Sequence, residues 1–158
     1  MVKLLREEAS KPSVSCIAFR RIIFDEDVAA AVLQLYRSDV ARKWKQIEFY
    51  HCTGLIEVAL TAPLVLDAVE SFTIPYLDVP TSIALGTSLS FSNALRCLRL
   101  KDNLFEENCA AIANGLEENT SLKELNLKGC AISEEAVLLL AKGLGNSHSQ
   151  GLTVVSLL

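Results

Sequence analysis

The sequence has no excess of basic residues, which binding to nucleic acids or to an anionic membrane surface would require. It contains 15 Lys and Arg against 19 Asp and Glu, so its formal net charge is −4 at pH 7. Phosphate groups are held mainly by many Lys and Arg side chains acting together. We therefore expect no nucleic-acid partner, and any basic surface must be local.

Long apolar runs and targeting signals are also missing. No stretch reaches the 18 or more consecutive apolar residues of a membrane span. The chain begins Met-Val-Lys-Leu-Leu-Arg-Glu-Glu, which lacks the apolar core of a secretory signal, and its early acids argue against a mitochondrial presequence. These absences predict a soluble intracellular protein without a membrane span, cytoplasmic by default, while another organelle stays open.

Residues and motifs for catalysis or metal binding are few. The two histidines, His51 and His148, are far apart, and no H-E-x-x-H, P-loop, G-x-G-x-x-G or G-x-S-x-G motif occurs. The five cysteines are an odd number without a C-x-x-C pair, which favours a reducing compartment over a disulfide or zinc framework. We therefore predict a protein that is not an enzyme and holds no cofactor or metal.

What the sequence does contain is a repeated phrase. Residues 122–130 read Leu-Lys-Glu-Leu-Asn-Leu-Lys-Gly-Cys, and residues 95–103, 27 positions earlier, read Leu-Arg-Cys-Leu-Arg-Leu-Lys-Asp-Asn. Both fit the pattern L-x-x-L-x-L-x-x-N/C, in which each copy supplies one β-strand. Weaker copies complete a series of six at intervals of 30, 25, 26, 27 and 30 residues. The six copies begin at Val14, Trp44, Val69, Leu95, Leu122 and Leu152.

Helix signals separate these strands. Asp25 is a typical N-cap, Pro80 suits the first turn of a helix, and Ser133 precedes two acids that complement the helix dipole. Apolar residues then recur every three or four positions, which predicts a face packed on the sheet. The residues predicted to point inward are Val28, Val32, Leu35 and Tyr36; Ile83, Ala84 and Leu85; Phe105, Cys109, Ile112 and Leu116; and Ile132, Ala136, Leu140 and Leu144.

From about Asn93 onward the chain resembles the ribonuclease-inhibitor-like class of leucine-rich repeats, because it carries the two phrases quoted above. The resemblance implies an α/β solenoid, a short right-handed horseshoe arc with a parallel β-sheet on its concave side and helices on its convex side. We expect an N-terminal cap segment at 1–13 and the repeat domain at 14–158. Proteins of this class generally bind other proteins on the concave sheet, so no catalytic residues carry over.

Strand geometry separates buried from exposed positions in each copy. Positions one, four and six should point into the core, and positions three, five and seven should point out, which places Thr73 on the exposed sheet face. Asn103 should satisfy backbone groups where its strand ends, with Cys52 and Cys130 as small buried equivalents. The residues predicted as scaffold are Leu98, Leu100, Leu125, Leu127 and Trp44.

The exposed columns predict a partner-binding surface on the concave face. Lys101 should lie beside Lys128, and Arg96 beside Lys123, because neighbouring strands are about 4.8 Å apart. Like charges side by side suit a surface that meets an acidic partner protein. The alternative is that these residues are solvated and keep an open sheet soluble, with Glu124 and Asp102 partly neutralising them. The residues predicted to contact the partner are Arg96, Arg99, Lys101, Lys123, Asn126, Lys128, Tyr50 and Glu48.

Two other functions stay open beside this non-catalytic protein–protein interaction module. Cys97 should face the concave side among basic side chains, which would lower its pKa and make it a reactive thiol; the simpler interpretation is an ordinary strand residue. The segment 152–158 is an uncharged, β-prone strand, and an open edge of this kind invites pairing with another chain. The protein could then be a structural subunit of a larger assembly, docked through that strand, or could self-associate there.

Overall fold

The computed structural model describes residues 14–39, 41–55, 67–74, 77–101, 105–146 and 152–156. In these residues the chain forms a six-stranded parallel sheet and a separate two-stranded one. The large sheet contains, in spatial order, β1 (Cys16–Arg20), β3 (Gln46–Tyr50), β5 (Ser71–Ile74), β6 (Cys97–Leu100), β7 (Glu124–Asn126) and β8 (Val154–Ser156). The small sheet pairs β2 (Ile23–Phe24) with β4 (Thr53–Gly54).

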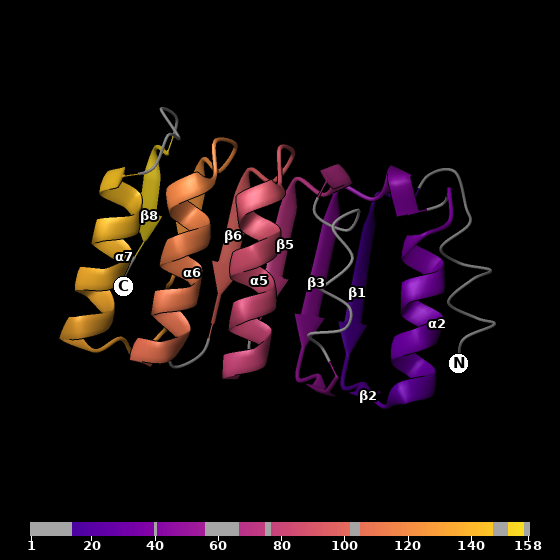
Figure 1. The fold of residues 1–158 in the computed structure, drawn as a ribbon. Coiled ribbons are helices and arrows are strands. Elements are labelled where there is room, and N and C mark those ends of the chain that lie inside the picture. Colours follow the sequence, from indigo (N-terminus) through magenta and orange to yellow (C-terminus); the bar gives the residue numbers. More distant parts are fainter. Residues whose placement is uncertain are drawn as a thin grey trace.

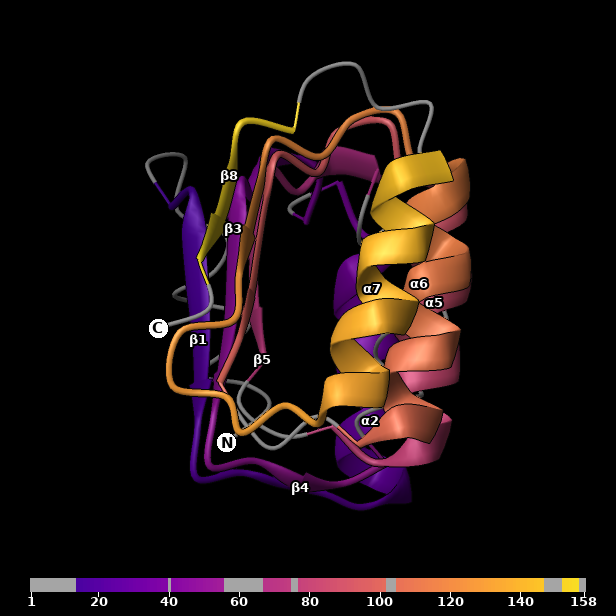
Figure 2. The ribbon, with the colours of Figure 1, turned by 90° about the vertical axis from the view of Figure 1, so that its left-hand side faces the viewer.

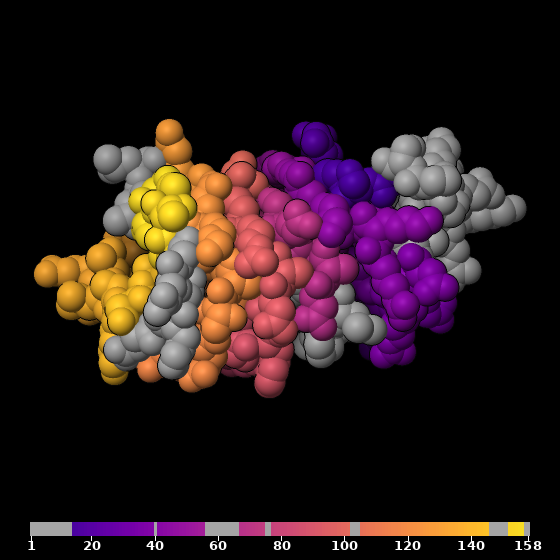
Figure 3. Space-filling view, turned by 90° about the horizontal axis from the view of Figure 1, so that it is seen from above, coloured from indigo at the N-terminus to yellow at the C-terminus, as the bar shows by residue number. Residues whose placement is uncertain are grey.

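Four α-helices and one short 3₁₀ helix are described, and the α-helices lie on the same side of the large sheet (Figures 1 and 2). They are α2 (Glu26–Tyr36), α5 (Val79–Phe91), α6 (Glu106–Glu118) and α7 (Glu134–Asn146), and the 3₁₀ helix η1 is Ala41–Lys43. Viewed from above, the segments follow one another across the molecule in chain order (Figure 3). The predicted α/β class with a parallel sheet is therefore confirmed.

The register of the large sheet agrees with the repeated phrase. The third position of each copy pairs with the third position of the next: Cys16 with Gln46, Gln46 with Ser71, Ser71 with Cys97, Cys97 with Glu124, and Glu124 with Val154. Because side chains alternate between the two faces of a strand, this register also aligns all inward positions. The strand positions predicted from the six copies are confirmed.

The core lies between the sheet and the helices and is built from the inward strand positions. The predicted scaffold leucines and Trp44 are all buried, Trp44 completely. Phe19, Phe49 and Phe72 follow one another across β1, β3 and β5, with ring centroids 5.1 Å and 5.7 Å apart along the series. Aromatic pairs at such distances add to the stabilisation from their buried area.

Three of the four described α-helices begin where a short polar side chain accepts a backbone N–H, and α6 is the exception. Asp25 Oδ1 accepts from the Val28 N–H at 2.8 Å, and Asp78 Oδ1 accepts from the Thr81 N–H at 2.8 Å. Ser133 Oγ accepts from the Ala136 N–H at 3.2 Å. Each contact satisfies one of the amide groups that a first helical turn leaves free. The starts predicted at Asp25, Pro80 and Ser133 are confirmed.

Glycine allows α5, α6 and α7 to pack closely side by side. A Cβ atom added at Gly86 would lie 2.2 Å from the Ala111 carbonyl oxygen, and one at Gly115 would lie 2.2 Å from the Gly86 carbonyl oxygen. A Cβ at Gly143 would lie 2.5 Å from the Ala113 carbonyl oxygen. Any larger residue at these positions would force the helices apart and away from the strands that they cover.

Two residues predicted to point inward do not. Ile83 is 55% exposed, because the helix phase turns Ser82, Leu85 and Leu89 toward the core instead. Phe105 is 62% exposed because it is the N-cap of α6 and not part of its body. Asn103, Pro75 and the proposed cap segment 1–13 lie outside the described residues. No helix in the described part of the chain is long and apolar enough to cross a membrane.

Candidate protein-binding face

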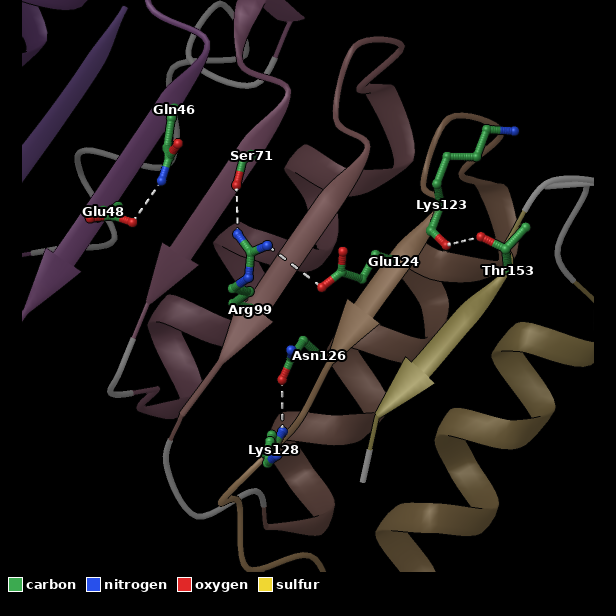
Figure 4. Close-up of polar contacts among 9 residues, drawn as sticks. All are labelled: Gln46, Glu48, Ser71, Arg99, Lys123, Glu124, Asn126, Lys128 and Thr153. Atoms are coloured by element: carbon green, nitrogen blue, oxygen red, sulfur yellow. Dashed lines mark hydrogen bonds and ion pairs between the residues drawn. The ribbon is translucent and has the colours of Figure 1, made fainter. Parts of the chain in front are cut away.

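The candidate site is the sheet face that points away from the helices, which we call the open face. The outward positions of β1, β3, β5, β6 and β7 supply its side chains, and inward neighbours on the same strands are buried. Figure 4 shows part of this surface, from Gln46 on β3 to Thr153 before β8. All eight residues predicted to contact a partner lie on strands of this face or within two residues of a strand end.

Arg99 is held at the middle of the open face by residues of the strands on either side. Its Nη1 donates to Ser71 Oγ at 3.0 Å, and its Nη2 lies 3.6 Å from Glu124 Oε1. Arg99 and Glu124 are each about one-third exposed (34% and 33%), so the pair is partly shielded from water. The guanidinium therefore bridges β5 and β7 and is not a free cation (Figure 4).

The cations at the amino ends of the strands are engaged as well. Lys123 N–H donates to the Arg96 carbonyl oxygen at 2.8 Å, so these residues are neighbours as predicted. The Arg96 side chain, however, donates from Nη1 to the Ser121 carbonyl oxygen at 2.7 Å. Lys45 Nζ lies 2.8 Å from Glu70 Oε1, and this hydrogen-bonded lysine lowers the pKa of the Glu70 carboxyl. Exposed ion pairs of this kind contribute little to stability.

Tyr50, the last residue of β3, lies between two cations. The Arg20 guanidinium carbon is 4.9 Å from the centre of its ring, and Lys101 Nζ is 5.8 Å from the same point. Glu48, two residues earlier, accepts a hydrogen bond from Gln46 Nε2 at 2.7 Å. Partial burial, then a hydrogen bond to Glu48, raises the pKa of the Tyr50 phenol. Tyr50 is thus a neutral hydrogen-bonding group at neutral pH.

Asn126 and Lys128 are placed by a turn at the end of β7. Asn126 Oδ1 accepts from the Lys128 backbone N–H at 3.0 Å, and Gly129 follows with a φ of 82° (Figure 4). Side-chain amides of asparagine commonly stabilise a turn in this way. Asn126 therefore shapes the end of the strand, and Lys128 stands exposed beyond it.

Sequence reasoning missed the burial of Thr73 at the centre of the open face. Thr73 is only 1% exposed, although its strand position is an outward one. It pairs in register with Glu48 on one side and Arg99 on the other, and these longer side chains stand beside it. Its Oγ1 is buried with no hydrogen-bond partner within the described ranges. The sequence signal for this burial was that a short residue, Thr73, is aligned between two longer ones, Glu48 and Arg99.

The cysteines do not behave as the reactive-thiol hypothesis requires. Burial raises the pKa of the half-buried Cys97 thiol. The Arg99 guanidinium lowers this pKa, and the Glu124 carboxylate offsets part of that lowering. Cys52 Sγ donates to the Phe19 carbonyl oxygen at 3.4 Å, and Cys130 Sγ donates to the Leu100 carbonyl oxygen at 3.1 Å. These two contacts satisfy backbone groups where strands end, as predicted, but Cys52 is buried and Cys130 is only half-buried. The described residues contain no His, Cys, Asp and Glu group that could hold a metal ion.

A hollow of about 360 Å³ lies away from the open face, between α5 and α6. Gly86 and Gly115 are among its lining residues, and Glu118 supplies its one charged lining residue. None of the eight predicted contact residues lines it. The open face and this hollow are therefore separate features.

No protein-family model matches this chain, and no curated protein matches it. The function must therefore be argued from the geometry of the open face and from the sequence pattern.

Proposed function

We propose that the chain is a leucine-rich-repeat solenoid of the ribonuclease-inhibitor-like class and that its open face is the concave, partner-binding side of a short horseshoe. The repeated phrase, the unbroken parallel order of six strands and their shared register support this assignment. So do Cys52 and Cys130, which bond to carbonyl groups of the preceding strand at equivalent places. The class membership rests on these features together.

One observation supports protein binding most directly: no described helix covers the open face of the parallel sheet (Figure 2). All-parallel sheets are almost always covered by helices on both faces, because the side chains on both faces are normally apolar. Here the face carries half-exposed polar side chains and Tyr50 instead. Such a surface is stable in water and still offers an aromatic anchor with hydrogen-bonding groups, as interfaces do.

A second candidate function is that of a structural subunit docked through β8, which is the edge strand in the order of the described sheet. Val154 and Val155 are 45% and 44% exposed. An apolar hollow beside them is lined by Val155, by residues of α7 and by two leucines of the β7 segment, Leu125 and Leu127. Exposed apolar strand edges favour pairing with another chain.

Site-specific photo-crosslinking in an extract of the native cells tests both candidates. A photoreactive amino acid would replace Lys123 on the open face, Val137 at the apolar hollow, or Lys142 on α7 as a matched exposed lysine. We expect discrete crosslinked proteins from position 123 and none from position 142. Crosslinks from position 137 alone would favour the structural subunit, and equal crosslinking from all three positions would contradict both functions.

A further inference from the structure

Two groups of cations on the open face differ in what they contact, and Lys123 belongs to neither. Lys45, Arg96 and Arg99 are held by a carboxylate or a carbonyl oxygen, as described above. Three others lie at the opposite ends of the strands: Arg20 ends β1, Lys101 directly follows β6, and Lys128 follows β7 by two residues. In the part of the chain that the structure describes, the ion pairs involve none of these three.

Tyr50 explains how two of these cations can gather without an ion pair. The face of an aromatic ring carries negative charge density and attracts cations within about 6 Å of its centre. Arg20 and Lys101 both meet this condition at Tyr50. The ring brings the cations together without forming an ion pair with either of them, and the Glu48 carboxylate is hydrogen-bonded to Tyr50 itself. We call Arg20, Tyr50, Lys101 and Lys128 the strand-end row.

The rest of the molecule makes this row the favoured place for an anion. Two acidic residues lie on the other layer in the first turn of each of α2, α6 and α7, where Glu and Asp complement the helix dipoles. An acidic partner is therefore repelled by the helix layer and attracted to the row. Such asymmetry steers association and orients the partner.

We propose that the strand-end row binds an acidic, extended segment of a partner protein. This inference rests on the proposed function and adds the chemistry of the partner. Arg20 Cζ and Lys101 Nζ lie 4.9 Å and 5.8 Å from the centre of the Tyr50 ring, so the two charged groups are no farther apart than the sum of these distances. An extended segment places every second side chain about 7 Å apart, so carboxylates at alternate positions can reach both cations. Lys128, one strand beyond Lys101, extends the row by a further contact.

The probe is a fluorescein-labelled octapeptide of alternating Glu and Ser, with Gln–Ser and Lys–Ser octapeptides as controls, measured by fluorescence anisotropy. We expect the Glu–Ser peptide to bind and the other two to bind at least about tenfold more weakly, a difference of about 1.4 kcal/mol. Binding should weaken as salt rises from 50 to 300 mM, because these exposed charges are screened. Equal affinity for the Glu–Ser and Gln–Ser peptides would overturn the inference.

Charge reversal locates the site. Lys101→Glu and Lys128→Glu should each weaken binding of the Glu–Ser peptide about tenfold, whereas Lys142→Glu, the same change on α7, should alter it less than about twofold. Equal effects of Lys101→Glu and Lys142→Glu would show a non-specific dependence on net charge and would also overturn the inference. If position 123 crosslinks native partners while the acidic peptide fails to bind, the open face binds proteins of another kind. If position 123 gives no crosslinks and the acidic peptide does not bind, the proposed function is contradicted as well.

Discussion

Replacement of Thr73 by valine should stabilise the protein. The Thr73 side chain is 1% exposed, and its hydroxyl has no hydrogen-bond partner in the described structure. A buried polar group left unsatisfied costs about 1–3 kcal/mol. Valine keeps the branched shape that a strand favours and replaces the hydroxyl with a methyl group. We therefore expect the free energy of unfolding of Thr73→Val to rise by about 1 kcal/mol.

Urea unfolding followed by far-UV circular dichroism measures this difference. The midpoint of the Thr73→Val transition should increase with an unchanged slope, because a changed slope would indicate an altered denatured or native state. A gain of about 1 kcal/mol corresponds to an increase in Tm of about 2–4 °C for a chain of this size. Thr73→Ser is the matched control, since it keeps the hydroxyl and removes the methyl group, and it should lower the midpoint. A destabilised Thr73→Val variant would refute the reasoning and show that the hydroxyl is bonded in solution.

Three further predictions concern the helices, a turn and a thiol. Gly115→Ala should destabilise the fold by about 1–3 kcal/mol because its Cβ would meet a carbonyl oxygen of α5. Gly145→Ala is the control and should be neutral or stabilising, because the space around Gly145 is open. Thermal unfolding of both variants measures the difference. Asn119→Ala should lose on the order of 3 kcal/mol, because four backbone groups each lose a hydrogen bond, whereas Asn93→Ala at an exposed site should change the urea midpoint little. The raised pKa of Cys97 keeps its thiol protonated to higher pH, so iodoacetamide should alkylate it more slowly at pH 8 than an unhindered model thiol; faster alkylation would restore the reactive-thiol hypothesis.

The sequence predicted the positions of the strands and most helix starts because both depend on neighbouring residues. Leucines at every second position place alternate side chains on one face, whatever lies beyond the strand. Asp25 bonds to an amide only three residues away, so its capping role is visible in the local sequence. The register also followed, because aligned copies of one phrase bring equivalent positions side by side. Membership of the leucine-rich-repeat class stays a prediction.

The small sheet of β2 and β4 and the exposure of Ile83 were not predicted. The copies of the phrase end before β2 and β4, and the two strands are 30 residues apart where they pair. The orientation of Ile83 depends on the residue at which α5 begins, because a shift of one residue turns a helix by about 100°. Sequence spacing alone left that phase undetermined.

In the candidate site, too, some features follow from the sequence and others depend on the tertiary structure. Sequence alternation by itself placed six of the eight predicted contact residues at the open face, because a strand turns every second side chain outward; Arg96 and Lys123 lie directly before their strands. Only the tertiary structure decided that Arg99 bonds to Ser71 and Glu124, that Tyr50 holds Arg20 and Lys101, and that Thr73 is buried. These contacts join residues about 25 to 50 positions apart, and they depend on how long side chains lean across neighbouring strands. Local sequence determines which face a residue occupies, and the packed sheet determines what the residue touches there.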